Sequence, residues 1–116
     1  MDIRCLIAIP LAAGMATMAS SQAPGGDVAA GRKSFYELGC AACHGTVGHA
    51  GGIAGPRVAP NVVPYAAFLA QLREPADKMP RYTVTVLSDA DAADIYAYLR
   101  AVPPARPGNQ IELLKR

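Results

Sequence analysis

The stretch Cys40-Ala41-Ala42-Cys43-His44 decides how this chain can fold. Its two cysteines lie on one helical turn, so each thiol can form a thioether with one of the two vinyl groups of a haem. The histidine that follows directly is then carried under the iron, where an imidazole nitrogen can bind the metal. The pattern predicts one covalently attached haem c, with Cys40 and Cys43 as its anchors and His44 as an axial ligand of the iron.

Three other interpretations of this stretch compete with haem attachment. A disulfide between Cys40 and Cys43 is natural in an exported protein. A thioredoxin-like redox motif would need a preceding strand within a βαβ pattern, and the sequence indicates neither. A zinc site would use the two cysteines with His44 and His49, but structural zinc sites usually space their two ligand pairs further apart.

The N-terminal residues have the pattern of a secretory signal peptide. Arg4 precedes a nearly uncharged apolar run from Cys5 to Met18, and small residues follow at 19–21. The run is shorter than the roughly 20 residues that span a bilayer, which argues against an uncleaved anchor. We therefore expect residues 1–21 to be removed, and residues 22–116 to form one domain in the periplasm with no membrane span.

The composition is that of a small domain built around a cofactor. The chain has 116 residues, a length that allows one ordinary domain. Only 6% of the residues are aromatic, whereas there are 11 Gly and 10 Pro, so side chains alone would build a thin core with many loops. The net charge of +2 is too small to indicate a nucleic-acid partner.

A helix is expected directly before the motif. Asp27 is a good N-cap for a helix from Val28 to about Leu38, and Gly39 is a typical residue to end it. The positions that share one face of this helix are Val28, Gly31, Phe35 and Leu38.

Two further helices are expected after the motif. The Gly- and Pro-rich segment 45–64 indicates an irregular loop, and a helix then runs from Pro64 to Arg73. The stretch 88–91, Ser-Asp-Ala-Asp, is a capping box for a last helix that Pro103 and its neighbour stop. We therefore predict an all-α, loop-rich fold, with three or more helices wrapped around the haem.

From Val28 to Val102 the chain resembles the class I c-type cytochromes. The resemblance rests on the CxxCH motif, on a Gly and an aromatic residue before it, and on aromatic and aliphatic residues in the last helix. It implies the cytochrome c fold, in which the first helix packs against the last. The residues that would meet there are Gly31 and Phe35 or Tyr36 from the first helix, and Ile95, Tyr96 and Leu99 from the last.

The resemblance also implies contacts on both sides of the haem. A Gly-Pro pair follows the ligand histidine, and the carbonyl of Pro56 would accept a hydrogen bond from the second ring nitrogen of His44. Residues 79–82, Met-Pro-Arg-Tyr, resemble the segment that provides the sixth ligand in small bacterial members, which makes Met79 the second axial ligand. Met79 is also the only Met within residues 22–116, and it does not lie in an apolar run.

His49 is a rival for the sixth position and would give a haem with two histidine ligands. It follows His44 so closely that the chain would have to wrap the haem edge within roughly 17 Å. We therefore expect His49 in a surface loop. Arg57, Tyr65 and Tyr82 are candidates to hydrogen-bond the haem propionates, and an ordinary surface position is the alternative for each.

An iron with both axial positions filled by protein is suited to one-electron transfer rather than to catalysis. The resemblance implies a periplasmic monohaem carrier between a dehydrogenase donor and an oxidase or cytochrome acceptor of the respiratory chain. One alternative is a tightly bound subunit of a flavin-, quinone- or molybdenum-dependent dehydrogenase, and another is a haem sensor or peroxidase-like protein. A weakly basic rim could steer an acidic partner, and it would consist of Arg57, Arg73, Lys78 and Arg81.

Overall fold

The structure is a computed structural model, which describes residues 23–50 and 54–114. These residues form four α-helices and two 3-10 turns, and no strand. The helices are α1 (Val28–Glu37), α2 (Cys40–His44), α3 (Tyr65–Arg73) and α4 (Asp89–Ala101), and the turns are η1 (Gly108–Gln110) and η2 (Glu112–Leu114). The predicted all-α fold is confirmed. The predicted signal peptide lies outside the described residues and stays a prediction.

Helix α1 begins and ends where the sequence indicates. The side chain of Asp27 accepts a hydrogen bond of 2.7 Å from the amide of Ala30, which caps the first turn. The helix ends at Glu37, and its buried residues are Gly31 and Phe35. Val28, predicted on the same face, is 46% exposed, because it lies in the first turn, ahead of the point where α1 meets the rest of the molecule.

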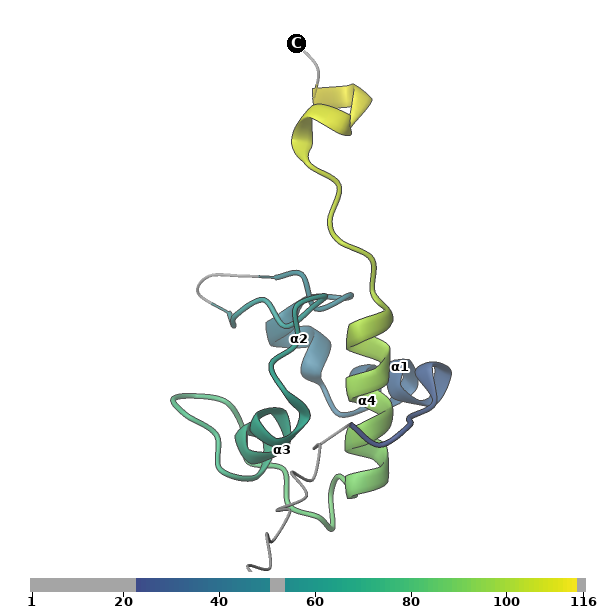
Figure 1. Ribbon diagram of the computed structural model, residues 1–116. Coiled ribbons are helices and arrows are strands. Elements are labelled where there is room, and N and C mark those ends of the chain that lie inside the picture. The colour runs from purple at the N-terminus through teal and green to yellow at the C-terminus, as the bar shows by residue number, and fades with distance from the viewer. Residues whose placement is uncertain (1–22, 51–53, 115–116) are drawn as a thin grey trace, which may run out of the picture.

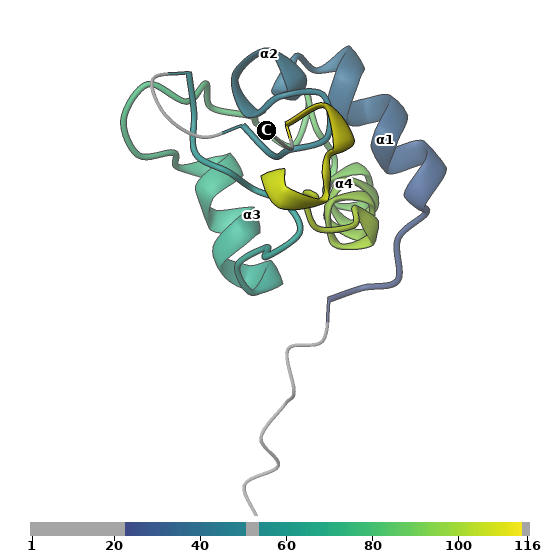
Figure 2. The same ribbon diagram turned by 90° about the horizontal axis from the view of Figure 1, so that it is seen from above.

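Helices α1 and α4 cross at Gly31 (Figures 1 and 2). A Cβ atom at this position would overlap the carbonyl oxygen of Asp94, so only glycine allows the two backbones to approach this closely. The carboxylate of Asp94 also accepts a 2.7 Å hydrogen bond from the amide of Asp27. Phe35 is only 1% exposed, and its ring centroid lies 5.6 Å from that of Tyr98.

Helix α4 is the central element, with α1 on one side and α3 on the other (Figure 2). Its first turn is capped by Ser88, whose hydroxyl accepts from the amide of Asp91 at 3.1 Å and donates to the Asp91 carboxylate at 2.6 Å. The predicted cap is confirmed. Because two helices cover it, α4 buries more than one stripe of side chains: Ala92, Ala93, Ile95, Tyr96, Tyr98 and Leu99.

Helix α3 begins at Tyr65, with Pro64 as its N-cap, one residue later than predicted. Its aromatic rings pack on Tyr96 of α4, at centroid distances of 5.2 Å from Tyr65 and 5.3 Å from Phe68. The expectation that Tyr96 packs against α1 is therefore wrong. Side chains two positions apart on a helix point in nearly opposite directions, so Tyr98 faces Phe35 while Tyr96 faces α3.

The chain after α4 leaves the body of the molecule (Figure 1). Among the described elements, η1 and η2 contact each other and no helix. Leu113, in the second of these turns, is 93% exposed. The fold that positions the site therefore ends with α4 and Val102.

Candidate haem-binding site

Helix α2 consists of the CxxCH motif itself and follows α1 after a two-residue turn. Cys40 is half-buried and Cys43 is exposed, and both are free thiols. The competing prediction of a disulfide between them is therefore not realised here. Burial raises the pKa of the Cys40 thiol above its ordinary value, so this side chain is a neutral thiol at physiological pH.

His44, the last residue of α2, has its imidazole oriented by one hydrogen bond. Its Nδ1 lies 2.8 Å from the carbonyl oxygen of Pro56. A carbonyl oxygen can only accept, so Nδ1 carries the proton and donates it. In the neutral ring Nε2 then has a free lone pair, which is the atom that a metal would bind.

Gly55 allows the segment before Pro56 to run directly along the motif. A Cβ atom on Gly55 would lie 3.0 Å from the carbonyl oxygen of Cys43 and 3.3 Å from Cε1 of His44. These contacts are tighter than side chains normally accept, so a larger residue would push Pro56 away from the histidine. The Gly-Pro pair thus has a geometric reason, namely to bring a carbonyl acceptor to Nδ1 of His44.

Met79 lies in the segment between α3 and α4, residues 74–88, called here the Met79 loop. Its side chain is half-buried and packs against the hydrophobic core. The amide nitrogen of Gln71, in the last part of α3, lies 3.7 Å from the Met79 sulfur. A methionine placed at an apolar surface with its sulfur near a polar donor has the chemistry of a thioether ligand.

The residues around the motif fit a large planar apolar group. Several apolar side chains contact the buried core and yet keep part of their surface exposed, which leaves an apolar face that a porphyrin could cover. This set includes a motif cysteine and the loop methionine, and its members are Leu38, Cys40, Ala41, Val58, Val62, Phe68, Leu69, Met79 and Tyr82. Together with the free Nε2 of His44, it makes the region suitable for a haem.

A family model described as cytochrome C oxidase, cbb3-type, subunit III matches residues 26–99. The chain belongs to this family of c-type cytochromes. The matched range begins just before the cap of α1 and ends in the last turn of α4, so it includes both the motif and the Met79 loop. No curated protein and no solved structure matches the chain.

Membership confirms the predicted family and the predicted class of function. A cytochrome c domain binds haem c and transfers electrons, so this cytochrome is a haem-binding electron carrier. No helix among residues 23–50 and 54–114 is long and apolar enough to cross a membrane. The roles of Cys40, Cys43, His44, Pro56 and Met79 toward the haem stay predictions.

His49 of the cytochrome lies in a loop, as predicted, but its side chain is half-buried rather than fully exposed. The carbonyl of Gly48 accepts hydrogen bonds from the amides of Val58 (2.9 Å) and Ala59 (3.0 Å), which folds the segment after the motif inward. As a result Nε2 of His49 is buried, and it has no hydrogen-bond partner within the described part of the chain. Sequence alone missed this because the glycines around His49 indicated an open loop.

Two of the three residues expected at the haem propionates have other partners in this cytochrome. The hydroxyl of Tyr65 donates to the carbonyl of Asp89 (3.2 Å), and the hydroxyl of Tyr82 donates to the carbonyl of Leu38 (3.0 Å). Burial is the main cause that raises the pKa of Tyr82 above its ordinary value. Arg57, the third, is exposed.

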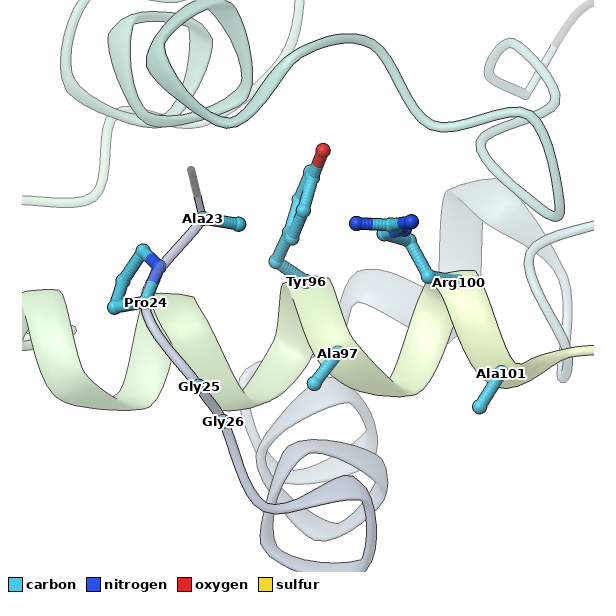
Figure 3. A pocket seen from close by; sticks show the side chains of 8 residues that line it. All are labelled: Ala23, Pro24, Gly25, Gly26, Tyr96, Ala97, Arg100 and Ala101. Atoms are coloured by element: carbon cyan, nitrogen blue, oxygen red, sulfur yellow. The ribbon is translucent and has the colours of Figure 1, made fainter. Parts of the chain in front are cut away.

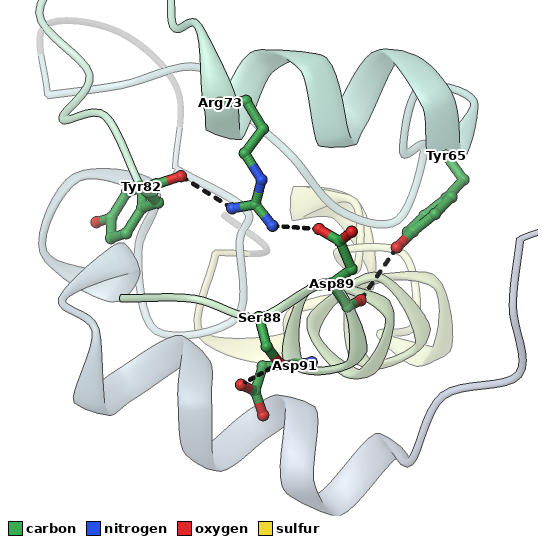
Figure 4. Close-up of polar contacts among 6 residues, drawn as sticks. All are labelled: Tyr65, Arg73, Tyr82, Ser88, Asp89 and Asp91. Carbon is green, nitrogen blue, oxygen red and sulfur yellow. Dashed lines mark hydrogen bonds and ion pairs between the residues drawn. The ribbon is translucent and has the colours of Figure 1, made fainter. Parts of the chain in front are cut away.

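Arg73 is not part of an exposed basic rim, because only 19% of its side chain is accessible. Its guanidinium donates to the carbonyl of Tyr82 (2.8 Å) and forms an ion pair with Asp89 (Figure 4). The exposed cations near the loop are therefore Lys78 and Arg81, with Arg57 in the preceding segment.

A shallow hollow on α4 does not contribute to the haem site. It lies between the lead segment 23–26 and the side chains of Tyr96, Ala97 and Arg100 (Figure 3). Arg100 lies over the Tyr96 ring, 5.8 Å from its centroid. None of the motif residues lines this hollow, so its role in the described structure is limited to packing the lead segment.

Proposed function

We infer that this chain is a periplasmic monohaem cytochrome that carries single electrons from a dehydrogenase to the respiratory chain. The observation that supports this most directly is the hydrogen bond from His44 Nδ1 to the Pro56 carbonyl. This bond places the ring proton on Nδ1 and leaves Nε2 available to ligate iron. The histidine concerned is the one that directly follows two free cysteines.

Cys40 and Cys43 would hold the haem covalently. Each thiol would add across one vinyl group, so that the sulfur bonds to one carbon and the hydrogen goes to the other, with no oxidant required. The exposure of Cys43 and the partial exposure of Cys40 leave both sulfurs accessible for this addition. Two covalent bonds would retain the cofactor in a domain that has few aromatic side chains with which to hold it.

His44 and Met79 would fill the two axial positions of the iron. A haem bound in this way supplies a one-electron couple. With both positions occupied, the protein would leave no site for a substrate. Methionine ligation and low polarity both favour the reduced state and raise the reduction potential, which suits an acceptor of electrons from a dehydrogenase.

The surface near the Met79 loop suits docking to an acidic partner. Lys78 and Arg81 flank the loop methionine and are exposed, as is Arg57. The printed description of the matching family refers to a subunit of a cytochrome c oxidase, which supports a terminal oxidase as the electron acceptor. The periplasmic location rests on the N-terminal sequence pattern alone.

A second candidate function, a tightly bound subunit of a dehydrogenase complex, is favoured by the C-terminal segment. Pro103 and Pro104 lead away from α4, and the exposed Leu113 and Leu114 follow at the far end. Exposed leucines at the end of a proline-containing stalk are typical of a segment that is buried against another protein. Gel filtration of extracts from native membranes and from the periplasm distinguishes the two functions. Co-elution with one partner at a constant stoichiometry indicates a subunit of a complex.

Mass spectrometry of the protein purified from the periplasm of a haem-attaching bacterium tests the proposal. We expect the mass of one haem on the peptide that contains residues 40–44, and an N-terminus close to residue 22. The variant Cys43→Ser is expected to keep a single thioether to the haem. The double variant Cys40→Ser/Cys43→Ser is expected to form none. Unmodified thiols in the wild type, in a strain that loads other c-type cytochromes, would contradict the proposal.

A further inference from the structure

Tyr82 connects the Met79 loop to its surroundings through three hydrogen bonds. The amide of Tyr82 donates to the carbonyl of Leu72 (2.9 Å), and its carbonyl accepts from Arg73 (2.8 Å). Its hydroxyl donates to the carbonyl of Leu38, just before the motif (3.0 Å). Tyr82 thereby connects the loop both to the end of α3 and to the segment that leads into α2.

Among these partners, Arg73 alone also bonds to Asp89, the residue that directly follows the loop. One guanidinium nitrogen donates to the Tyr82 carbonyl in the middle of the loop, and another pairs with the carboxylate of Asp89 at its end (Figure 4). The Arg73 side chain is 19% exposed, so water competes poorly at its bond to the Tyr82 carbonyl, whereas the Asp89 side chain is 65% exposed. Tyr65, at the opposite end of α3, also donates to Asp89, so α3 is attached to the start of α4 at both of its ends.

Along the chain, Met79 lies between Arg73, the last residue of α3, and Tyr82, where the loop returns to α3. The loop closes back on α3 at Tyr82, so the position of the sulfur depends on that closure. The amide of Gln71 lies 3.7 Å from the sulfur and gives no comparable restraint, because a thioether is a weak acceptor. If the closure opened, the remaining restraints on Met79 would be its packing against the core and the weak contacts of the Gln71 side chain with the Met79 sulfur and the Ala76 amide.

We propose that Arg73 is a positioning residue that keeps Met79 at the haem iron by clamping the Tyr82 carbonyl to the Asp89 carboxylate. This rests on the proposed function, in which Met79 is an axial ligand. Arg73 touches neither the iron nor the sulfur, and it acts by holding the loop closed. Loss of the clamp therefore increases the fraction of molecules in which Met79 has left the iron.

Binding of imidazole to the ferric, haem-loaded protein measures this fraction, because imidazole binds iron only after Met79 leaves. We expect Arg73→Met to bind imidazole about tenfold more tightly than the wild type, the factor that corresponds to losing a charged, partly buried hydrogen bond. Arg73→Lys keeps the charge but cannot form both bonds, so it should lie between the two. If Arg73→Met does not accumulate, Arg73→Lys carries the test alone.

The matched control is Arg100→Met, which makes the same chemical change on α4. Arg100 packs over the Tyr96 ring and is not connected to the Met79 loop by any contact described above. We expect its imidazole affinity to stay within about twofold of the wild type. Melting temperatures of all variants are measured in parallel, since a merely structural role of Arg73 would lower the melting temperature and leave imidazole affinity unchanged.

The outcomes separate this proposal from the proposed function. If Met79→Ala binds imidazole far more tightly than the wild type and Arg73→Met does not, Met79 is the ligand and the clamp is wrong. If Met79→Ala itself binds imidazole no more tightly than the wild type, the ligand assignment is wrong and the clamp fails with it. If imidazole affinity increases in Arg73→Met and Arg73→Lys but not in Arg100→Met, the result supports the clamp.

Discussion

The α1–α4 crossing and the Met79 loop are held by different forces. At the crossing, Gly31 brings two backbones into contact, and Phe35 and Tyr98 fill the space beside them with almost no exposed surface. In the loop, Leu87 is buried and Met79 and Tyr82 pack against the core, but most of residues 74–86 are exposed, and hydrogen bonds around Tyr82 fasten this part. A closely packed contact tolerates little change in side-chain volume, whereas a segment held by a few hydrogen bonds can open locally. Stability and axial ligation should therefore respond to different mutations.

The largest effect should follow from Gly31→Val at the crossing. Its side chain would collide with the carbonyl of Asp94, so the helices must separate, which we expect to cost more than about 3 kcal/mol and to prevent accumulation of folded protein. The control Ala30→Val adds a similar β-branched side chain at an exposed position of the same helix and should lower stability by under about 1 kcal/mol. Equal yields and melting temperatures of the two variants would show that the crossing is not close-packed.

The next largest effect is expected from removing the hydroxyl of Tyr82, with removal of the Tyr36 hydroxyl as the comparison. Tyr82→Phe removes the hydrogen bond to the Leu38 carbonyl beneath the loop, and we expect a loss of about 1 kcal/mol in chemical unfolding together with tighter imidazole binding. Tyr36→Phe removes an equivalent bond, from its hydroxyl to the Thr46 carbonyl (2.7 Å), on an exposed residue away from the loop. It should leave imidazole binding unchanged. The comparison fails if both variants change imidazole affinity equally.

A similar but purely structural loss is expected at the start of α4. Ser88→Ala removes the side chain that accepts from the amide of Asp91, which should cost about 1 kcal/mol. Ser88→Asp restores an acceptor at this position and should recover part of the loss. Both variants should keep the wild-type ferric spectrum, since this cap, at the last residue of the Met79 loop, acts on the first turn of α4. A changed spectrum in Ser88→Ala would show that the cap also positions the loop.

The smallest effect concerns alkaline pH. Burial raises the pKa of Tyr98 above its ordinary value of 10.0, so the folded state favours the neutral phenol. The stability from this preference is complete below pH 10 and is lost as the pH rises through the folded pKa. The unfolding free energy should therefore fall as the pH rises above 10, and less steeply in Tyr98→Phe. Identical slopes in the two proteins would refute this.

The sequence predicted those features that depend on neighbours along the chain. The caps at Asp27 and Ser88, the helix ends and the motif on one helical turn all follow from local patterns, and the structure contains them. The contact between His44 and Pro56 was expected from family resemblance, and the hydrogen bond is present.

The features that sequence missed depend on tertiary contacts. Tyr96 was assigned to the wrong neighbour because helical spacing identifies a stripe without saying which helix covers it. The inward position of His49 results from a backbone turn at Gly48. Arg73 looked like a surface charge, and only the return of the loop at Tyr82 gives it two partners. No short-range pattern contains this information.

The absorption spectrum of the ferric, haem-loaded protein, recorded for the wild type and Met79→Ala, tests the central claim most directly. The claim is that the hydrogen-bonded loop, and not the packed core, provides the second axial ligand. We predict a charge-transfer band from methionine sulfur to iron in the wild type, and its loss in Met79→Ala while the helical content is retained. A high-spin spectrum in the wild type, or a band that survives the substitution, would contradict the claim.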